Sequence, residues 1–313
     1  MSVKAIIEKI TEQIQEGIYP GASLALYRNG QWSEHYLGLA DPEKGEPVEA
    51  DLVYDLASVS KVIGVATICA FLYAKGEFPL DRPFKELYPR FVHEKTTIRE
   101  LLTHTSGLDP FIPNRDHLDA RQLKTALENL QLKEDKSFHY TDVNFLLLGF
   151  WLEDRFHQPL DRLFEELIFT PWKMTETRFG PAEKAVPTVR GVASGSVHDP
   201  KARVLGCHAG SAGLFSTVAD LERFLEHYLK DDFARDLSQN FAREEGKTRA
   251  LGWNLEGDWL DHTGYTGTFI MYNRKRQEAV IFLSNRTYEK DERAQWILDR
   301  NSLMDLIKQE CEK

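Results

Sequence analysis

The chain has 313 residues, of which 42% are hydrophobic and 28% charged, as in an ordinary globular protein with one large domain or two small ones. The formal net charge of −10 argues against nucleic acid as a partner, because phosphate binding requires clustered lysine and arginine. The three cysteines, Cys69, Cys207 and Cys311, are widely spaced. Their odd number and spacing predict a reducing compartment, no disulfide framework and no zinc site.

The N-terminal segment predicts an amphipathic helix rather than a secretion signal, because charged residues interrupt its apolar positions. These apolar positions are Val3, Ile6, Ile7, Ile10 and Ile14. No stretch of the chain approaches 18 apolar residues, so we expect no membrane span. Since no signal-like segment is present, we expect a cytoplasmic protein.

The remaining pattern predicts strands near both ends and helices between them. Residues 22–27 and 32–39 have the composition of strands, and Asn29-Gly30 between them predicts a hairpin. Thr97 with Glu100, and Thr217 with Asp220, are expected to form capping boxes that open two helices, over 98–103 and from 218 to about 229. Further helices are expected over 120–130, 143–156, 160–168 and 292–308, and further strands over 267–272 and 279–284.

This order predicts one sheet built from distant segments. We expect a single domain over residues 1–313, in which 1–60 and 190–313 form an α/β subdomain and 61–189 form a mainly helical one. A ligand cleft is expected between the two parts.

The first candidate for chemistry is Ser58-Val59-Ser60-Lys61, which precedes an apolar helix predicted over 62–72. Positions i and i+3 share a helix face, so Ser58 and Lys61 are expected side by side. A desolvated lysine can take the proton of a serine hydroxyl and so activate it as a nucleophile. In isolation, such a pair is more often an N-capping serine with a solvated lysine.

Two further motifs add to this pair. Tyr140-Thr141-Asp142 precedes the predicted helix over 143–156, where the tyrosine hydroxyl can project into a cleft and act as a general base or acid. His262-Thr263-Gly264 is followed by Tyr265, and a backbone N–H beside such small residues can donate to an oxyanion. Taken singly, the first motif is more typical of a partly buried tyrosine with Thr141 or Asp142 capping the next helix. The second is also typical of a simple glycine-containing turn.

The three motifs occur in the order S-x-x-K, Y-x-(N-like) and (K-like)-T-G. With the stretches 101–108 (LLTHTSGL), 195–200 (GSVHDP), 212–217 (AGLFST) and 283–286 (LSNR), they resemble the serine β-lactamase and penicillin-recognising enzyme family. Its class C β-lactamase and carboxylesterase branches are the most similar, and the resemblance runs from about residue 14 to 307. It implies an α+β fold of the β-lactamase/transpeptidase type: an antiparallel sheet flanked by helices, with an inserted helical subdomain.

The resemblance also implies a mechanism without a cofactor. Ser58 attacks an acyl carbonyl, Lys61 and Tyr140 share the proton transfers, and the N–H groups of Ser58 and Tyr265 form the oxyanion hole. The implied substrate-binding residues are Asp142, Asn144, His262, Thr263 and Gly264. The implied substrate is a small acyl compound.

Two residues depart from the family pattern. Asp142 occupies a position where the family commonly has an asparagine, and an ionised carboxylate only accepts hydrogen bonds. His262 stands where lysine is common, and a neutral histidine holds a carboxylate less firmly. Both departures weaken the β-lactamase and D,D-peptidase interpretations and leave a broader ester or amide hydrolase.

Other classes of function stay open. A non-catalytic binding module on the same fold has no need of Ser58, Lys61 and Tyr140 together. A metal-dependent hydrolase lacks an H-E-x-x-H spacing, and His104 and His198 are expected to be structural. Ser211, in a near match to G-x-S-x-G, is expected to lie in a loop rather than to act as the nucleophile. The physiological substrate and the oligomeric state are not predicted by the sequence.

Overall fold

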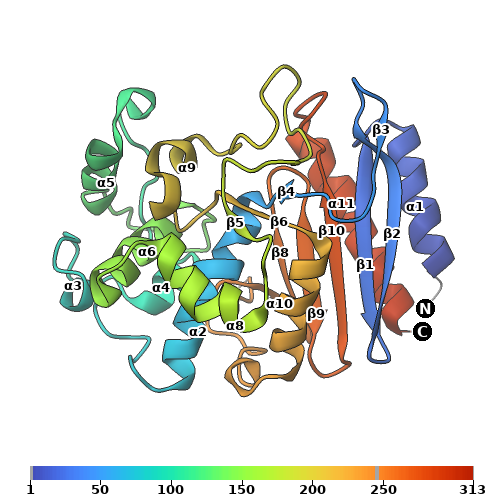
Figure 1. The fold of residues 1–313 in the computed structure, drawn as a ribbon. Helices are drawn as coiled ribbons and strands as arrows, with labels where there is room; N and C mark the ends of the chain where they lie inside the picture. Colours follow the sequence, from blue (N-terminus) through green and yellow to red (C-terminus); the bar gives the residue numbers. More distant parts are fainter. Residues whose placement is uncertain (1–2, 244–246, 313) are drawn as a thin grey trace.

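The computed structural model describes residues 3–243 and 247–312. Its main sheet has seven antiparallel strands in the order β3-β2-β1-β10-β9-β8-β7. The strands are β1 (Gly21–Arg28), β2 (Gln31–Asp41), β3 (Glu46–Pro47), β7 (Asn254–Glu256), β8 (Trp259–Thr263), β9 (Phe269–Asn273) and β10 (Glu278–Ser284). Because β1 pairs with β10, with Ala25 opposite Ile281, the two ends of the chain meet in one sheet, as the sequence predicts (Figure 1).

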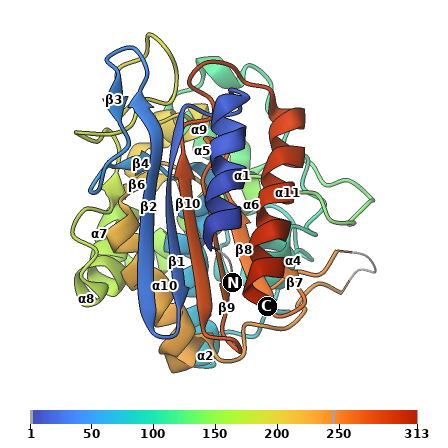
Figure 2. The same ribbon diagram turned by 90° about the vertical axis from the view of Figure 1, so that its right-hand side faces the viewer.

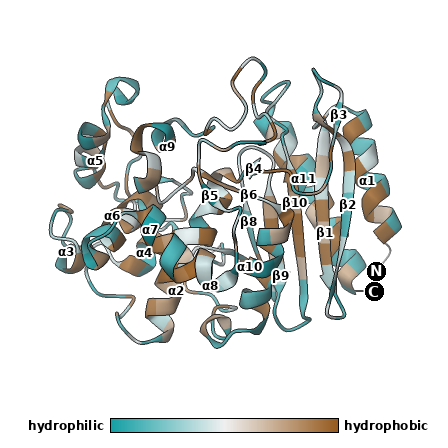
Figure 3. Ribbon diagram, viewed as in Figure 1, coloured by the Kyte–Doolittle hydropathy of each residue, from teal (hydrophilic) through white to brown (hydrophobic). Residues whose placement is uncertain are grey.

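Helices cover both faces of this sheet. The terminal helices α1 (Val3–Gln15) and α11 (Arg293–Glu312) lie side by side on one face (Figure 2). Helix α10 (Val218–Lys230) packs against β1, β9 and β10 on the other face. Strand β1 is central and buried on both sides, with Leu24 facing the cluster under α1 and α11 and Ala25 facing the larger core. Figure 3 shows hydrophobic residues along β1 and β10, and a helix α1 with hydrophobic residues on one side and hydrophilic residues on the other.

The helical part lies beyond α10. Its helices are α2 (Thr67–Ala74), α3 (Phe84–Leu87), α4 (Ile98–Thr103), α5 (Ala120–Glu128), α6 (Val143–Phe156), α7 (Leu160–Phe164), α8 (Thr170–Trp172) and α9 (Pro200–Leu205). A small three-stranded sheet in the order β4-β6-β5 joins it to the main sheet, and its strands are β4 (Tyr54–Asp55), β5 (Arg178–Phe179) and β6 (Leu214–Ser216). These strands, and β7 and β8, were not expected from the sequence, because most are too short to show an alternating pattern.

Most local predictions are confirmed. The hairpin turn has positive φ at Asn29 (53°) and Gly30 (80°), the geometry that Asn-Gly favours. Thr97 and Glu100 form the expected capping box. The second capping box is wrong: Thr217 caps the N–H of Asp220, but the Asp220 carboxylate accepts hydrogen bonds from Glu176 and Thr177 instead.

The helix after Ser58 is less regular than predicted. A 3-10 turn (Ala57–Val59) and a π-turn (Val62–Ala66) precede α2. The stretch Ala57–Ala74 does have the length and mean hydropathy (1.7) of a membrane span, contrary to the expectation, but 78% of it is buried inside the fold. That burial is typical of the core helix of a globular domain.

Gly64 in the π-turn is required by close packing. A Cβ atom there would lie 2.3 Å from the ring of Phe164. We predict that Gly64→Ala lowers the free energy of unfolding by about 1–3 kcal/mol, because the ring has to move within a packed core. Urea unfolding measures this change. Gly64→Ala combined with Phe164→Leu should show a positive coupling in a double-mutant cycle, and strictly additive losses would contradict the steric explanation.

Candidate active site

The structure places Ser58 and Lys61 in direct contact. The short helical turn that begins at Ala57 puts both side chains on one face, and Lys61 Nζ lies 2.9 Å from Ser58 Oγ. Ser58 is half-buried at the wall of a cavity, whereas Lys61 is completely buried beneath it. The predicted pairing of a serine with a desolvated lysine is therefore present in the fold.

Lys61 has three acceptors for its three protons. Nζ donates to Ser58 Oγ, to Asp142 Oδ1 at 2.7 Å and to the backbone carbonyl of Ser211 at 2.9 Å. Burial lowers the pKa of Lys61, but the charge of Asp142 and the neighbouring Tyr140 outweigh burial and raise that pKa above its ordinary value. Lys61 is thus an ammonium ion in the resting site, and it is placed as an electrostatic partner rather than as the group that takes the serine proton.

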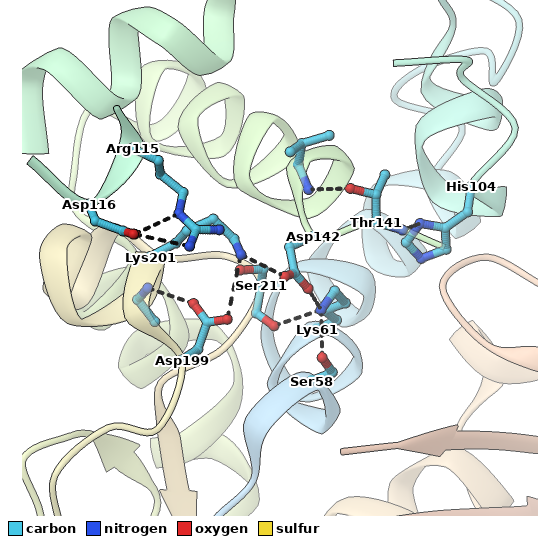
Figure 4. Close-up of polar contacts among 12 residues, drawn as sticks. Ser58, Lys61, His104, Arg115, Asp116, Thr141, Asp142, Asp199, Lys201 and Ser211 are labelled. Carbon is cyan, nitrogen blue, oxygen red and sulfur yellow. Dashed lines mark hydrogen bonds and ion pairs between the residues drawn. The ribbon is translucent and has the colours of Figure 1, made fainter. Parts of the chain in front are cut away.

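Asp142 lies between two lysines. Its Oδ1 contacts Lys61, and its Oδ2 contacts Lys201 Nζ at 3.0 Å (Figure 4). Burial raises the pKa of this carboxyl, but the two ammonium charges more than offset burial and hold the pKa well below its usual range. The ionised Asp142 lines the cavity, yet each of its oxygens is already bound to a lysine.

Tyr140 stands at the entrance of the site, just before α6, with 38% of its surface exposed. Its ring centroid lies 5.2 Å from Lys61 Nζ and 4.6 Å from the ring centroid of His104. The ring therefore packs against the site while remaining accessible from the cavity, which Tyr140 lines together with Ser58.

The third motif lies at the end of β8. Gly264 passes so close to the chain before Ser58 that a Cβ there would lie 2.6 Å from the Leu56 carbonyl oxygen. Thr266 Oγ1 donates to the carbonyl of Asp55, and Thr268 Oγ1 donates to that of Leu56. These bonds fasten the turn that carries Tyr265 to the turn that carries Ser58, and both residues line the same cavity. The arrangement fits the predicted oxyanion hole.

His262 is buried beside Tyr140, with their ring centroids 6.2 Å apart. Burial, with the charges of Lys61 and Arg249, holds its pKa well below 6.5, so the imidazole is neutral. Neither of its ring nitrogens has a hydrogen-bond partner among the described residues. Together with Thr263 and Gly264, His262 lines a side compartment of the cleft.

Asn144 is the exception among the predicted substrate-binding residues. It is completely buried, accepts a hydrogen bond from Ser106 Oγ at 2.7 Å and contacts His104 Nδ1 at 3.2 Å. Two positions along a helix differ by about 200° in direction, so Asn144 points into the core while Asp142 faces the cavity. The expectation that Asn144 binds substrate is therefore corrected.

The cleft has two compartments that share Ser58, Tyr140, Tyr265 and Arg293. The larger measures about 670 Å³ and carries the exposed Phe111 at its rim. The smaller measures about 220 Å³ and is lined by His262 and by cations. The combined space suits a small organic substrate.

Sequence reasoning missed several polar residues in the cleft. Lys201 on α9 faces the larger compartment, and Lys247, Arg293 and Arg300 line the smaller one. Nothing local marks these cations, because only the tertiary fold brings them together. Ser211, expected to lie in a loop, meets Lys61 through its backbone carbonyl, and its hydroxyl has no described partner.

Two negative findings concern the described part of the chain. No group of three or more His, Cys, Asp or Glu residues there is arranged to hold a metal ion. Cys69 and Cys207 form no disulfide, and Cys69 is buried in the core.

A buried carboxylate supports the turn that carries Ser58. Asp55 accepts from the N–H of Ala57 at 2.8 Å and from the N–H of His198 at 2.7 Å. Ala57 has φ of 45°, an unusual value for a residue with a Cβ. Asp55 therefore holds the turn before Ser58 and the loop before Lys201 at a fixed distance from each other.

Comparisons with known proteins point to one family. The family model described as Beta-lactamase matches residues 6–303. A protein of Escherichia coli (strain K12) named "Putative D-alanyl-D-alanine carboxypeptidase" is 27% identical, over 89% of this chain and 81% of that protein. A class C β-lactamase from Rhodobacter sphaeroides superimposes with a TM-score of 0.76 at 19% identity, covering 97% of this chain and 99% of that one. EstCE1, a hydrolase with promiscuous acyltransferase activity, gives 0.77 at 18% identity, covering 96% and 97%.

The buried Asp55 gives a prediction of pH dependence. Burial raises the pKa of Asp55 from 3.8 to about 6, against the hydrogen bonds from His198 and Ala57. The folded protein then holds this proton more tightly than the unfolded chain, so the stability contributed by the proton is complete below about pH 4 and is lost as the pH rises through about 6.

Asp55→Asn removes this titration. We expect the stability of the wild type relative to this variant to fall by about 1–3 kcal/mol between pH 4 and pH 7, measured by urea unfolding. The amide leaves one N–H unpaired, which adds an offset that does not depend on pH. If the difference in unfolding free energy between the wild type and Asp55→Asn is the same at pH 4 and pH 7, the prediction is contradicted.

Proposed function

Because this chain belongs to the Beta-lactamase family, a family of serine hydrolases, we propose that it hydrolyses an ester or amide through an acyl-enzyme on Ser58. The observation that carries the proposal is the buried Lys61 ammonium 2.9 Å from Ser58 Oγ, at the wall of a cavity that Tyr140 and Tyr265 also line. A binding module gains nothing from a buried charge aimed at a hydroxyl, since burying a charge is costly.

Each residue has a defined part in the proposed reaction. Tyr140 takes the Ser58 proton as Oγ attacks the acyl carbonyl, and the nearby Lys61 charge favours this transfer. The N–H groups of Ser58 and Tyr265 stabilise the oxyanion. Tyr140 then returns the proton to the leaving group, and a water molecule releases the acyl group by the same steps.

Asp142 favours esters over peptides in this proposal. A substrate amide would need a side-chain donor to bind its carbonyl oxygen, and an ionised carboxylate cannot donate. Both Asp142 oxygens are also occupied by lysines. The likeness to EstCE1 is in keeping with an esterase-like preference.

Replacement of Ser58 tests the proposed nucleophile. Ser58→Ala should reduce hydrolysis of p-nitrophenyl butyrate by about 10⁴-fold or more, because no covalent intermediate can form. A chromogenic cephalosporin, run alongside, should turn over slowly in the wild type. A fluorophosphonate probe should label the wild type and not the variant.

Ser238→Ala, at an exposed position, is the matched control and should keep both activity and labelling. Unchanged ester hydrolysis in Ser58→Ala would overturn the assignment.

A second candidate, a carboxypeptidase-like activity, is favoured by the cations of the smaller compartment. Lys247, Arg293 and Arg300 line it. Among the described residues none of the three forms an ion pair, although the charge of the buried Asp261 acts on Lys247 and Arg300. They form a region of positive charge beside the neutral His262, in a protein with a net charge of −10. An acidic group on the leaving side of the substrate would be bound there.

Two matched esters test this preference: phenyl butyrate and 3-carboxyphenyl butyrate. We expect the wild type to prefer the carboxylate ester in kcat/KM. Arg300→Met should lower kcat/KM for that ester by about 10- to 100-fold, because a hydrogen bond to a charged group is lost. The neutral ester should be unaffected. An equal effect on both esters would show that Arg300 does not recognise the carboxylate.

A further inference from the structure

The charges behind Ser58 form an alternating series that ends in α9. Lys61 contacts Asp142, Asp142 contacts Lys201 at 3.0 Å, and Lys201 lies 3.7 Å from Asp199. Figure 4 shows Lys201 between the two carboxylates. The Lys201 side chain is only 13% exposed, so its charge is weakly screened by solvent. No part of the reaction proposed above uses Lys201.

The contact with Asp142 reduces the effect of Lys61. A positive charge beside Ser58 favours the loss of the Ser58 proton that the reaction requires. The carboxylate 2.7 Å from Lys61 opposes that charge. Lys201, bound to the other oxygen, opposes the carboxylate in turn. Lys61, Asp142 and Lys201 therefore sum to one positive charge, whereas Lys61 and Asp142 alone sum to zero. Asp199, on the far side of Lys201, brings the sum of all four groups to zero but is the one farthest along the series from Ser58.

We propose that Lys201 is a positioning residue for the acylation of Ser58, which acts through Asp142 by neutralising its charge and by turning one of its oxygens away from Lys61. This inference rests on the proposed function, since it assumes that Ser58 is acylated. It gives α9 a part in the chemistry, although Lys201 lies 143 positions from Ser58 in the sequence.

The other charged groups around the site do not replace Lys201. Asp199 lies on the far side of Lys201 and also caps α9 through the N–H of Ala202. His104 and His262 are neutral, because burial holds the pKa of each well below 6.5. Arg249 is buried near Tyr140 but has no contact with Asp142.

At the cavity wall, Arg115 pairs with Asp116. His198 stacks on Tyr265 at 5.4 Å between ring centroids, and burial lowers its pKa. Among the described residues, Lys201 is thus the one cation that contacts Asp142 Oδ2.

Lys201→Met tests the proposal. Acylation of the wild type and the variant is followed as the burst of p-nitrophenol from p-nitrophenyl butyrate. We expect the acylation rate of Lys201→Met to be about 10- to 100-fold lower than that of the wild type. Loss of one adjacent charge changes a proton-transfer equilibrium by about this factor. The acid limb of the pH–rate profile should move to higher pH by about one unit, since a positive charge that favours proton loss is gone. Lys201→Arg should keep most of the activity.

A second variant separates charge from structure. Asp142→Asn combined with Lys201→Met again leaves one positive charge at Lys61, so acylation should recover at least tenfold over Lys201→Met alone. If Lys201 only anchored α9, the double variant would be as slow as the single one or slower, and the acid limb would not move. Either result would overturn the proposal.

The controls distinguish a failure of the inference about Lys201 from a failure of the proposed function. Lys275→Met removes an exposed lysine that pairs with Asp258 at 3.1 Å, and should leave acylation and the pH profile unchanged. Thermal unfolding of each variant establishes that it is folded. If Ser58→Ala retains activity, the proposed function fails. If Ser58 is acylated normally in Lys201→Met, only the inference about Lys201 fails.

Discussion

The buried ammonium of Lys61 is the interaction on which the rest of the site depends. A charge without access to water is tolerated only where its protons meet acceptors, and Lys61 has acceptors from three separate segments: Ser58, Asp142 and the carbonyl of Ser211. The lysine therefore determines the relative positions of the turn that carries Ser58, the start of α6 and the loop before β6. The same contacts that make its burial possible also direct it at Ser58.

The walls of the cleft are fastened to each other mainly by bonds to the backbone. Two threonine hydroxyls join the turn after β8 to the chain before Ser58, and Asp55 ties that chain to the loop that leads to α9. Gly264 permits the close approach. Donors fixed in this way need no rearrangement when charge develops on a substrate oxygen, which is the main advantage of an oxyanion hole.

Much of this arrangement could be predicted from the sequence. Ser58 and Lys61 are three residues apart at the start of a helix, so local geometry alone puts them in contact. Tyr140 and Tyr265 follow from the resemblance of their motifs to a known family. Asn144 failed because a helix turns the second residue after Asp142 into the core. The cations Lys201 and Arg300 come from helices whose packing no short pattern encodes.

The pairing of β1 with β10 has a consequence for the order in which the site is assembled. The turn that carries Tyr265 and the strand that holds β1 in the sheet, Glu278–Ser284, are synthesised more than two hundred residues after Ser58 and Lys61. A chain that ends before residue 265 has this serine and lysine but lacks the Tyr265 N–H of the proposed oxyanion hole. The proposed reaction therefore depends on the docking of residues 265–284, and the Ser58–Lys61 pair alone does not complete the site.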